Sequence, residues 1–131
     1  MPNQTPVPAM PKGRVLVVED DRASRSALMM LLRIIGFDPF PATNVAEALV
    51  ALQESPACLI LDLMLPDGNG STVLSHIRRN NLPIRVALAT GAIDWQTMIE
   101  SSPGKPDAVF HKPLDFKKLT AWLEEQCGGS E

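Results

Sequence analysis

The chain has 131 residues, 45% of them hydrophobic, which is the size of one globular domain and leaves no room for a second. Its formal net charge of -3, with basic residues scattered along the chain, argues against direct binding of nucleic acid. No apolar run approaches the ~20 residues of a membrane span and the first residues lack a signal-peptide pattern, so we expect a cytoplasmic protein that does not contact a membrane.

The first part of the chain predicts a tail, a strand and a helix. Residues 1–12 contain four prolines and are expected to form an extended, flexible tail. The apolar run at residues 15–18 predicts a buried strand. Residues 22–35 place leucine and isoleucine at helical spacing, and Gly36 is suited to end that helix.

A second strand and helix follow. Residues 37–42 contain Pro39 and Pro41, which suit an edge strand because proline cannot donate to a sheet. Asn44 and Glu47 then resemble a capping box, which predicts a helix reaching to residue 54.

The second half of the chain repeats the alternation of strand and helix. Strands are predicted at residues 57–61, 86–89 and 107–111, and the turn-rich segment 65–70 precedes a helix at 71–79. A short helix is expected within residues 94–102, and a last helix begins near Asp115 as its N-cap. Residues 127–131 are expected to form a C-terminal tail or linker stub.

Five strands alternating with five helices predict a doubly wound α/β sandwich around a parallel sheet. In such sheets, ligand chemistry gathers at the carboxyl ends of the strands. Polar residues stand at these ends: Glu19, Asp20 and Asp21 after the first strand, Asp62 after the third, Thr90 after the fourth, and Lys112 after the fifth. We therefore expect these side chains to share one site.

Carboxylates brought this close repel one another, and a cation must offset the repulsion. Mg²⁺ suits a site with a few carboxylate ligands whose other positions are left to water or phosphate. The competing explanation is that Glu19, Asp20 and Asp21 only favour the start of the following helix through its dipole.

Several short motifs occur together in one order at compatible spacings: Val17-Val18-Glu19-Asp20, Leu61-Asp62-Leu63-Met64-Leu65-Pro66 with Gly70, Ala89-Thr90-Gly91, and His111-Lys112-Pro113-Leu114. Over residues 13–126 the chain thus resembles the receiver domain of two-component response regulators. The resemblance implies a flavodoxin-like (βα)5 sandwich with strand order 2-1-3-4-5.

The resemblance also implies a function and a role for each matching residue. Asp62 would accept a phosphoryl group from a phosphohistidine on a sensor histidine kinase or a histidine phosphotransfer protein. Glu19, Asp20, Asp62 and the backbone carbonyl of Met64 would hold Mg²⁺. Lys112 would pair with Asp62 and later with phosphate, and the Thr90 hydroxyl would bind a phosphate oxygen. Asp21 would start the helix.

The chain departs from the family pattern at two places. Val109 stands three residues before Lys112, where many receivers have an aromatic residue, and Phe110 next to it is expected to be ordinary core. The proline- and serine-containing segment 101–106 should shorten the fourth helix.

Two other functions remain open. An aspartyl phosphohydrolase would also use Mg²⁺ and a nucleophilic Asp, but it would want a second acid where this chain has Met64. A receiver-like module that binds partners without phosphorylation is disfavoured by the intact Asp20, Asp62, Thr90 and Lys112.

The two cysteines, Cys58 and Cys127, indicate neither a metal site nor a disulfide framework, and we expect one buried thiol and one incidental thiol.

Overall fold

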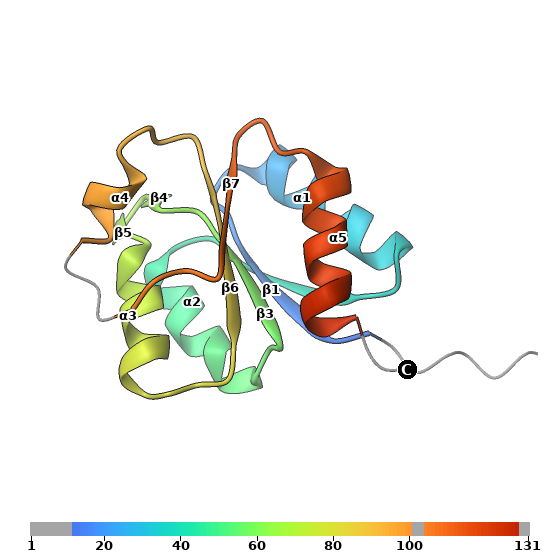
Figure 1. Ribbon diagram of the computed structural model, residues 1–131, viewed down its shortest axis with the longest axis horizontal. Helices are drawn as coiled ribbons and strands as arrows, with labels where there is room; N and C mark the ends of the chain where they lie inside the picture. Colours follow the sequence, from blue (N-terminus) through green and yellow to red (C-terminus); the bar gives the residue numbers. More distant parts are fainter. Residues whose placement is uncertain (1–11, 101–103, 129–131) are drawn as a thin grey trace, which may run out of the picture.

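The structure, a computed structural model, describes residues 12–100 and 104–128. A parallel five-stranded sheet runs through its centre, with the strands in the order β2-β1-β3-β6-β7 (Figure 1). Counted along the chain within this sheet, the order is 2-1-3-4-5, which confirms the flavodoxin-like topology. The strands are β1 (Arg14–Val18), β2 (Asp38–Ala42), β3 (Cys58–Leu61), β6 (Arg85–Thr90) and β7 (Ala108–His111).

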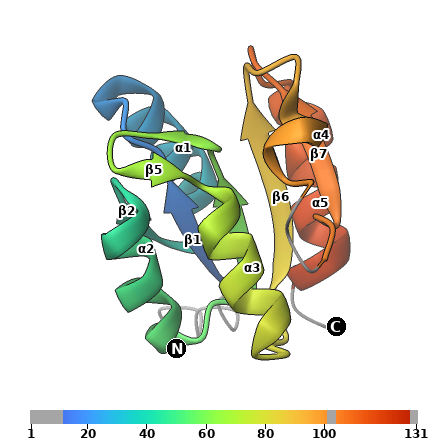
Figure 2. The same ribbon diagram turned by 90° about the vertical axis from the view of Figure 1, so that its left-hand side faces the viewer.

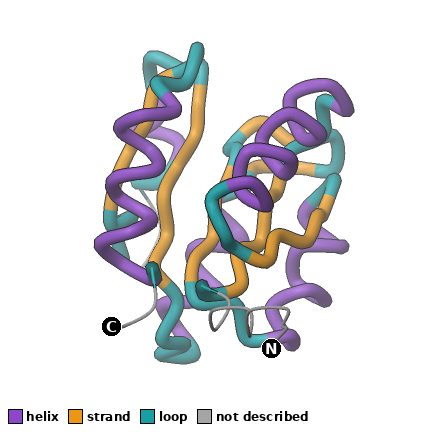
Figure 3. The backbone as a smooth tube through the Cα atoms, turned by 90° about the vertical axis from the view of Figure 1, so that its right-hand side faces the viewer, coloured by secondary structure: helices purple, strands orange, loops and turns teal. Residues whose placement is uncertain are grey.

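Helices cover both faces of the sheet (Figures 1 and 3). The face that we call the long-helix face carries α1 (Arg22–Ile34) and α5 (Phe116–Cys127). The opposite face, called here the short-helix face, carries α2 (Val45–Ala51) with a 3₁₀ turn η1 (Leu52–Glu54), α3 (Ser71–Arg79) and α4 (Trp95–Met98). Within the described ranges, no helix is both long and apolar enough to cross a bilayer.

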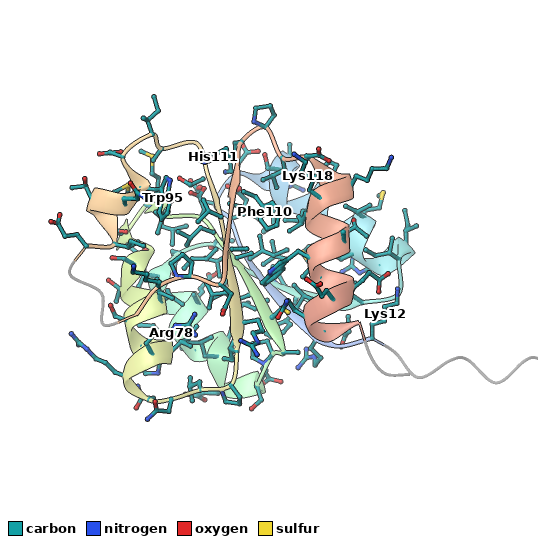
Figure 4. All side chains as sticks on the ribbon, in the orientation of Figure 1. Lys12, Arg78, Trp95, Phe110, His111 and Lys118 are labelled. Carbon is teal, nitrogen blue, oxygen red and sulfur yellow. The ribbon has the colours of Figure 1, made fainter. Side chains whose placement is uncertain are left out.

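The alternation of side chains along the strands divides the core in two. In β1, Val15 and Val17 pack under the long-helix face, whereas Leu16 and Val18 pack under the short-helix face. All four are buried, as expected for a parallel sheet covered on both sides. Figure 4 shows side chains filling the space between the sheet and each layer of helices.

The predicted helix ends are formed by local hydrogen bonds. Asp21 accepts from the Ser24 amide at 2.8 Å at the start of α1, and Asp115 accepts from the first turn of α5. Gly36 has φ +101° just after α1, a conformation in which a side chain would be strained. These three predictions from sequence are confirmed.

Only one of the two hydrogen bonds of the predicted capping box at residues 44–47 forms between Asn44 and Glu47. Asn44 accepts from the Glu47 amide at 2.8 Å, but the Glu47 carboxylate accepts from the amide and hydroxyl of Thr43. Thr43, one residue before the N-cap, is therefore the partner that the sequence pattern did not predict.

The turn-rich segment contains a small ladder that the sequence did not indicate. β4 (Met64–Leu65) and β5 (Gly68–Asn69) pair antiparallel directly after β3. α4 has four residues, in line with the expected shortening; of the stretch 94–102 in which it was expected, residues 101 and 102 lie outside the described residues.

The expectation that Cys127 is an incidental thiol is wrong. Cys127 is the last residue of α5, and its Sγ lies 2.7 Å from the Sγ of Cys58 at the start of β3. The sequence could not predict this contact because 69 positions separate the two residues.

Candidate functional site

The predicted polar residues meet at the carboxyl edge of the sheet. In Figure 2 the strand arrows of β1 and β6 point to the same end of the molecule, as parallel pairing requires. Backbone hydrogen bonds fix the residues beyond the strands: the Asp62 amide donates to the Val18 carbonyl at 3.0 Å, and the Lys112 amide donates to the Thr90 carbonyl at 2.9 Å. Glu19 follows Val18 directly, so all of these side chains start from one edge.

Three carboxylates form a compact cluster. One carboxylate oxygen from each of Glu19, Asp20 and Asp62 can be chosen so that all lie within 4.8 Å of one another. Glu19 and Asp62 are buried, with 7% and 6% exposed, while Asp20 is exposed. Charges at this separation repel by several kcal/mol at an effective dielectric of about 20, so the cluster needs a counter-charge.

Lys112 supplies part of this counter-charge. Its Nζ donates to Glu19 Oε1 at 2.7 Å and to Asp62 Oδ2 at 3.0 Å. Burial alone would lower the pKa of Lys112, but the hydrogen bonds and charges of Glu19 and Asp62 outweigh it and raise the pKa. The lysine therefore stays protonated at neutral pH, and bridges two strands of the sheet.

One lysine among three carboxylates supplies only part of the positive charge that the cluster needs, and the exposed Asp20 leaves the cluster accessible from solvent. Oxygen donors of this kind, few in number and partly exposed, fit Mg²⁺ better than a soft metal. The fourth predicted ligand is the carbonyl of Met64. The Met64 amide donates to Asp62 Oδ1 at 3.0 Å, which places the Met64 backbone beside the Asp62 carboxylate, while the residue as a whole is largely exposed.

Thr90 is fully buried at the end of β6, the strand next to β3. Its Oγ1 accepts from the amide of Ala92 at 3.0 Å. This bond holds the threonine oxygen against the loop that leads to α4, so that movement of the hydroxyl and movement of this loop are coupled.

Gly70 allows the chain to turn back close to the backbone of Asp62. Its amide donates to the Leu63 carbonyl at 2.8 Å, and a Cβ at this position would come within 2.3 Å of the Asp62 carbonyl oxygen. A side chain here would therefore push the backbone of Asp62 out of place. This close approach explains physically why the sequence pattern has glycine at residue 70.

Sequence reasoning missed two residues of the β3–α3 connection. Asp67 accepts from the amides of Val45 and Ala46 at 2.7 and 3.1 Å, at the start of α2. Asn69 donates through Nδ2 to the Met98 carbonyl in α4 at 2.9 Å. Polar residues in a turn-rich loop gave no signal for these distant partners, which join the loop after Asp62 to two helices.

Phe110 packs against the core, as predicted, whereas the two histidines lie at the surface. His76 and His111 are exposed. Phe110 is half-buried and meets Trp122 edge to face, with the ring centroids 6.2 Å apart, on the long-helix face. Trp95, the first residue of α4, is half-buried on the short-helix face, and Figure 4 shows Phe110 and Trp95 on opposite sides of β7.

Comparison with known proteins agrees with this geometry. A family model described as the response regulator receiver domain matches residues 15–124. The transcriptional regulatory protein CpxR homolog of Haemophilus influenzae is 35% identical over 113 residues, which cover 86% of this chain and 49% of the relative. The chain thus spans about half the length of the curated relatives that it matches.

Solved structures share the fold. A sensor protein from Polaromonas sp. JS666 is 27% identical with a TM-score of 0.78, covering 88% of this chain and 96% of that one. Response regulator protein TrrA from Thermotoga maritima, in complex with Mg²⁺-BeF, is 25% identical with a TM-score of 0.77, covering 86% and 97%. The chain belongs to the family of response regulator receiver domains, the signalling modules of two-component systems.

Proposed function

We propose that this chain is a phosphorylation-activated switch in which Asp62 accepts a phosphoryl group from a phosphohistidine donor in a Mg²⁺-dependent reaction. The observation that carries the proposal is the position of the Asp62 carboxylate. It is buried at a strand end, between the Lys112 amine at 3.0 Å and the carboxylates of Glu19 and Asp20.

This arrangement suits phosphoryl transfer. The transition state spreads negative charge over the phosphoryl oxygens, so catalysis consists mainly of positioning and charge stabilisation. Asp62 Oδ1 is held by the Met64 amide and Oδ2 by Lys112, which fixes the nucleophile in one orientation. Lys112 lies close enough to Asp62 to donate to the phosphate oxygens once they carry the negative charge.

Glu19, Asp20, Asp62 and the Met64 carbonyl are the residues that would hold Mg²⁺. The bound ion would supply positive charge that draws the donor phosphate toward the carboxylate of Asp62. Asp20 is exposed and so is reachable from solvent, whereas Glu19 is tied to Lys112 and to the amide of Asp21.

Phosphorylation adds about -1.5 to -2 units of charge and three strong acceptors beside Thr90. Because the Thr90 oxygen already accepts from Ala92, its hydroxyl proton can turn toward a phosphate oxygen. Such a turn would pull on the loop before α4, which is the kind of local change that a receiver passes to a partner.

The partner in phosphoryl transfer is proposed to be a sensor histidine kinase or a histidine phosphotransfer protein, in the cytoplasm. The receiver domain, expected over residues 13–126, also includes Lys12, which pairs with Glu124, and Cys127, the last residue of α5. The tails expected over residues 1–12 and 127–131 otherwise lie almost wholly outside the described residues. Direct contact with nucleic acid is not part of the proposal, because the net charge is -3 and the basic residues are scattered.

Labelling with a small phosphodonor tests the function. Acetyl phosphate and Mg²⁺ should add one acid-stable, base-labile phosphoryl group, and Asp62→Asn should abolish it. The matched control is Asp94→Asn, an exposed aspartate on the loop after β6 whose side chain caps no helix; labelling should persist. Undiminished labelling of Asp62→Asn would refute the assignment.

The metal ligands are tested in the same assay with neighbouring residues. Asp20→Asn should raise the Mg²⁺ concentration needed for half-maximal labelling, whereas Asp21→Asn should not, because Asp21 caps α1 and asparagine is an equally good cap. Continuous turnover of generic phosphomonoesters without dependence on Asp62 would favour the hydrolase. Partner binding that ignores phosphodonor and Mg²⁺ would favour the phosphorylation-independent module.

A further inference from the structure

The two cysteines form a cluster that the proposed switch does not use. Cys58 begins β3 and Cys127 ends α5, and their sulfur atoms lie 2.7 Å apart. Both are free thiols. They lie at the amino edge of the sheet, at the opposite end of β3 from Asp62. Figure 4 shows Lys12 near the same end of α5, far from His111 at the carboxyl edge.

The backbone around the pair holds the end of α5 close to the sheet. The Gly13 amide donates to the Cys127 carbonyl at 3.1 Å. A Cβ at Gly13 would come within 3.0 Å of both the Ala57 Cβ and the Cys127 carbonyl oxygen. Absence of a side chain at residue 13 therefore lets the last turn of α5 approach the start of β3.

Lys12 also holds the last turn of α5 in place. Its Nζ donates to the Glu124 carboxylate at 2.5 Å and to the Ile35 carbonyl at 2.6 Å. The end of α5 is thus joined to the segment before β1 by a backbone hydrogen bond and an ion pair. The sulfur contact is part of an ordered arrangement and does not depend on a loose helix end.

The two thiols differ in exposure and acidity. Cys58 is fully buried, and Cys127 is half-buried at the surface end of the helix. The hydrogen bond to Cys127 and burial raise the pKa of Cys58, whereas the same bond lowers the pKa of Cys127 because it stabilises the thiolate. Cys127 is therefore the thiol suited to react first, and Cys58 the one suited to resolve the product.

We propose that Cys58 and Cys127 are a redox modification site that forms a reversible intramolecular disulfide on exposure to a peroxide. The Cys127 thiolate attacks one peroxide oxygen, the O–O bond breaks, and a sulfenic acid and hydroxide form. The Cys58 thiol gives its proton to that hydroxide, which becomes the first water. The Cys58 sulfur then attacks the Cys127 sulfur, the S–O bond breaks, and the departing hydroxide takes up the proton that Cys127 released when it ionised, which gives the second water. Two thiols are oxidised and one peroxide is reduced to two waters; a dithiol reductant reverses the change.

The disulfide would fasten the end of α5 to the start of β3 and close a loop from residue 58 to residue 127. A disulfide brings its sulfur atoms to about 2.05 Å, so only a small approach of the two side chains is needed. In a reducing compartment such a bond is transient and acts as a sensor. The inference does not rest on phosphoryl transfer at Asp62.

Thiol counting on the full chain tests the site. The reduced protein is treated with an equimolar amount of hydrogen peroxide, and its thiols are then counted in denaturant and its intact mass measured. Both thiols should disappear together, the mass should fall by two hydrogens, and no disulfide-linked dimer should form. Retention of both thiols, or their loss through disulfide-linked dimers or added oxygen, would overturn the proposal.

Single variants separate the two roles. Cys58→Ala should leave Cys127 to accumulate a sulfenic acid that a dimedone probe captures, while Cys127→Ala should react with peroxide at least tenfold more slowly than the wild type. Equal rates in Cys127→Ala and the wild type would contradict the assignment of Cys127 as the first thiol to react.

A measurement on the wild type tests the disulfide without depending on whether the variants fold. The cross-link constrains the unfolded chain, so the oxidised wild type should unfold at a temperature about 10 °C or more above the reduced one. The thermal midpoints are read by circular dichroism with and without a dithiol reductant. Equal midpoints would show that no bond clamps α5 to the sheet.

Discussion

The long-helix face and the α4 region of the short-helix face are held by different kinds of contact. On the long-helix face, α1 and α5 have 13 and 12 residues and pack apolar side chains along their length. On the short-helix face, α4 has four residues, none of them fully buried, and hydrogen bonds from neighbouring segments hold its surroundings. Asn69 bonds the Met98 carbonyl, and Arg78 bonds the Lys105 carbonyl at 2.7 Å.

The difference indicates where the fold can change at low cost. Apolar packing over a whole helix is lost only when the helix leaves the sheet, whereas a single hydrogen bond contributes about 0.5–1.5 kcal/mol and can be exchanged for another. Segments with few buried contacts open most readily. We therefore expect α4 and the segment before β7 to respond to the site, and α1 and α5 to act as a rigid support.

The largest effect is expected on the long-helix face. Leu32 in α1 is fully buried, so Leu32→Ala should leave a cavity and lower the free energy of unfolding by about 2–5 kcal/mol. Urea unfolding followed by circular dichroism measures this change. Ile34→Ala in the same helix is the control: Ile34 is 74% exposed, and its truncation should change stability by no more than about 0.5 kcal/mol. Similar losses in both variants would contradict a packed support.

A smaller effect is expected at the polar junction of the short-helix face. Asp107 accepts from the Val86 amide at 2.7 Å and forms an ion pair with Arg78 at 3.0 Å. Its side chain is 24% exposed. Asp107→Asn keeps the size but removes the charge, and should cost about 1–3 kcal/mol in urea unfolding at neutral pH.

The pH dependence of this difference follows from the pKa of Asp107. Partial burial by itself raises that pKa, but the Val86 amide and Arg78 outweigh burial and lower it below its ordinary value. A lowered pKa in the folded state gives stability that is present above the unfolded pKa of about 3.9 and is lost as pH falls through the folded pKa. The gap between wild type and Asp107→Asn should therefore shrink in acid. A gap that grows in acid would show that the carboxylate does not act as an ion.

The sequence predicted the framework because most of its signals are local. Apolar runs marked four of the five main strands, Pro39 and Pro41 suited the second to an edge, and Asp21, Gly36 and Asp115 marked helix ends. The strand-end rule for parallel sheets brought Glu19, Asp62 and Lys112 to one edge before any geometry was known. The strand order came from the family resemblance, since periodicity alone does not decide which strands are neighbours.

What the sequence did not predict depends on tertiary contacts. The bond from Asn69 to Met98 and the contact between Cys58 and Cys127 join segments that are 29 and 69 positions apart. Neither leaves a periodic pattern, because each needs only one residue at each end. The bridge from Lys112 to Glu19, 93 positions away, was likewise not foreseen, although its bond to Asp62 was.

The smallest effect should be at the link between α4 and the loop that follows Asp62. Asn69→Ala removes the bond to the Met98 carbonyl and the bond from the Ser71 amide to Asn69 Oδ1, and should cost about 1 kcal/mol overall. Local opening of α4 should become easier, so the amides of Met98 and Ile99, which donate within that turn, should exchange with solvent roughly 2- to 10-fold faster.

Asn80→Ala is the matched control for this link. Asn80 also loses one side-chain hydrogen bond, to the His76 carbonyl at 2.8 Å, but this bond stays within the end of α3. Exchange in α4 should be unchanged there, although global stability falls by a similar amount. Equal acceleration of exchange in both variants would mean that α4 opens only when the whole domain unfolds. The α4 region would then be no less stable than the long-helix face, although its helix is shorter.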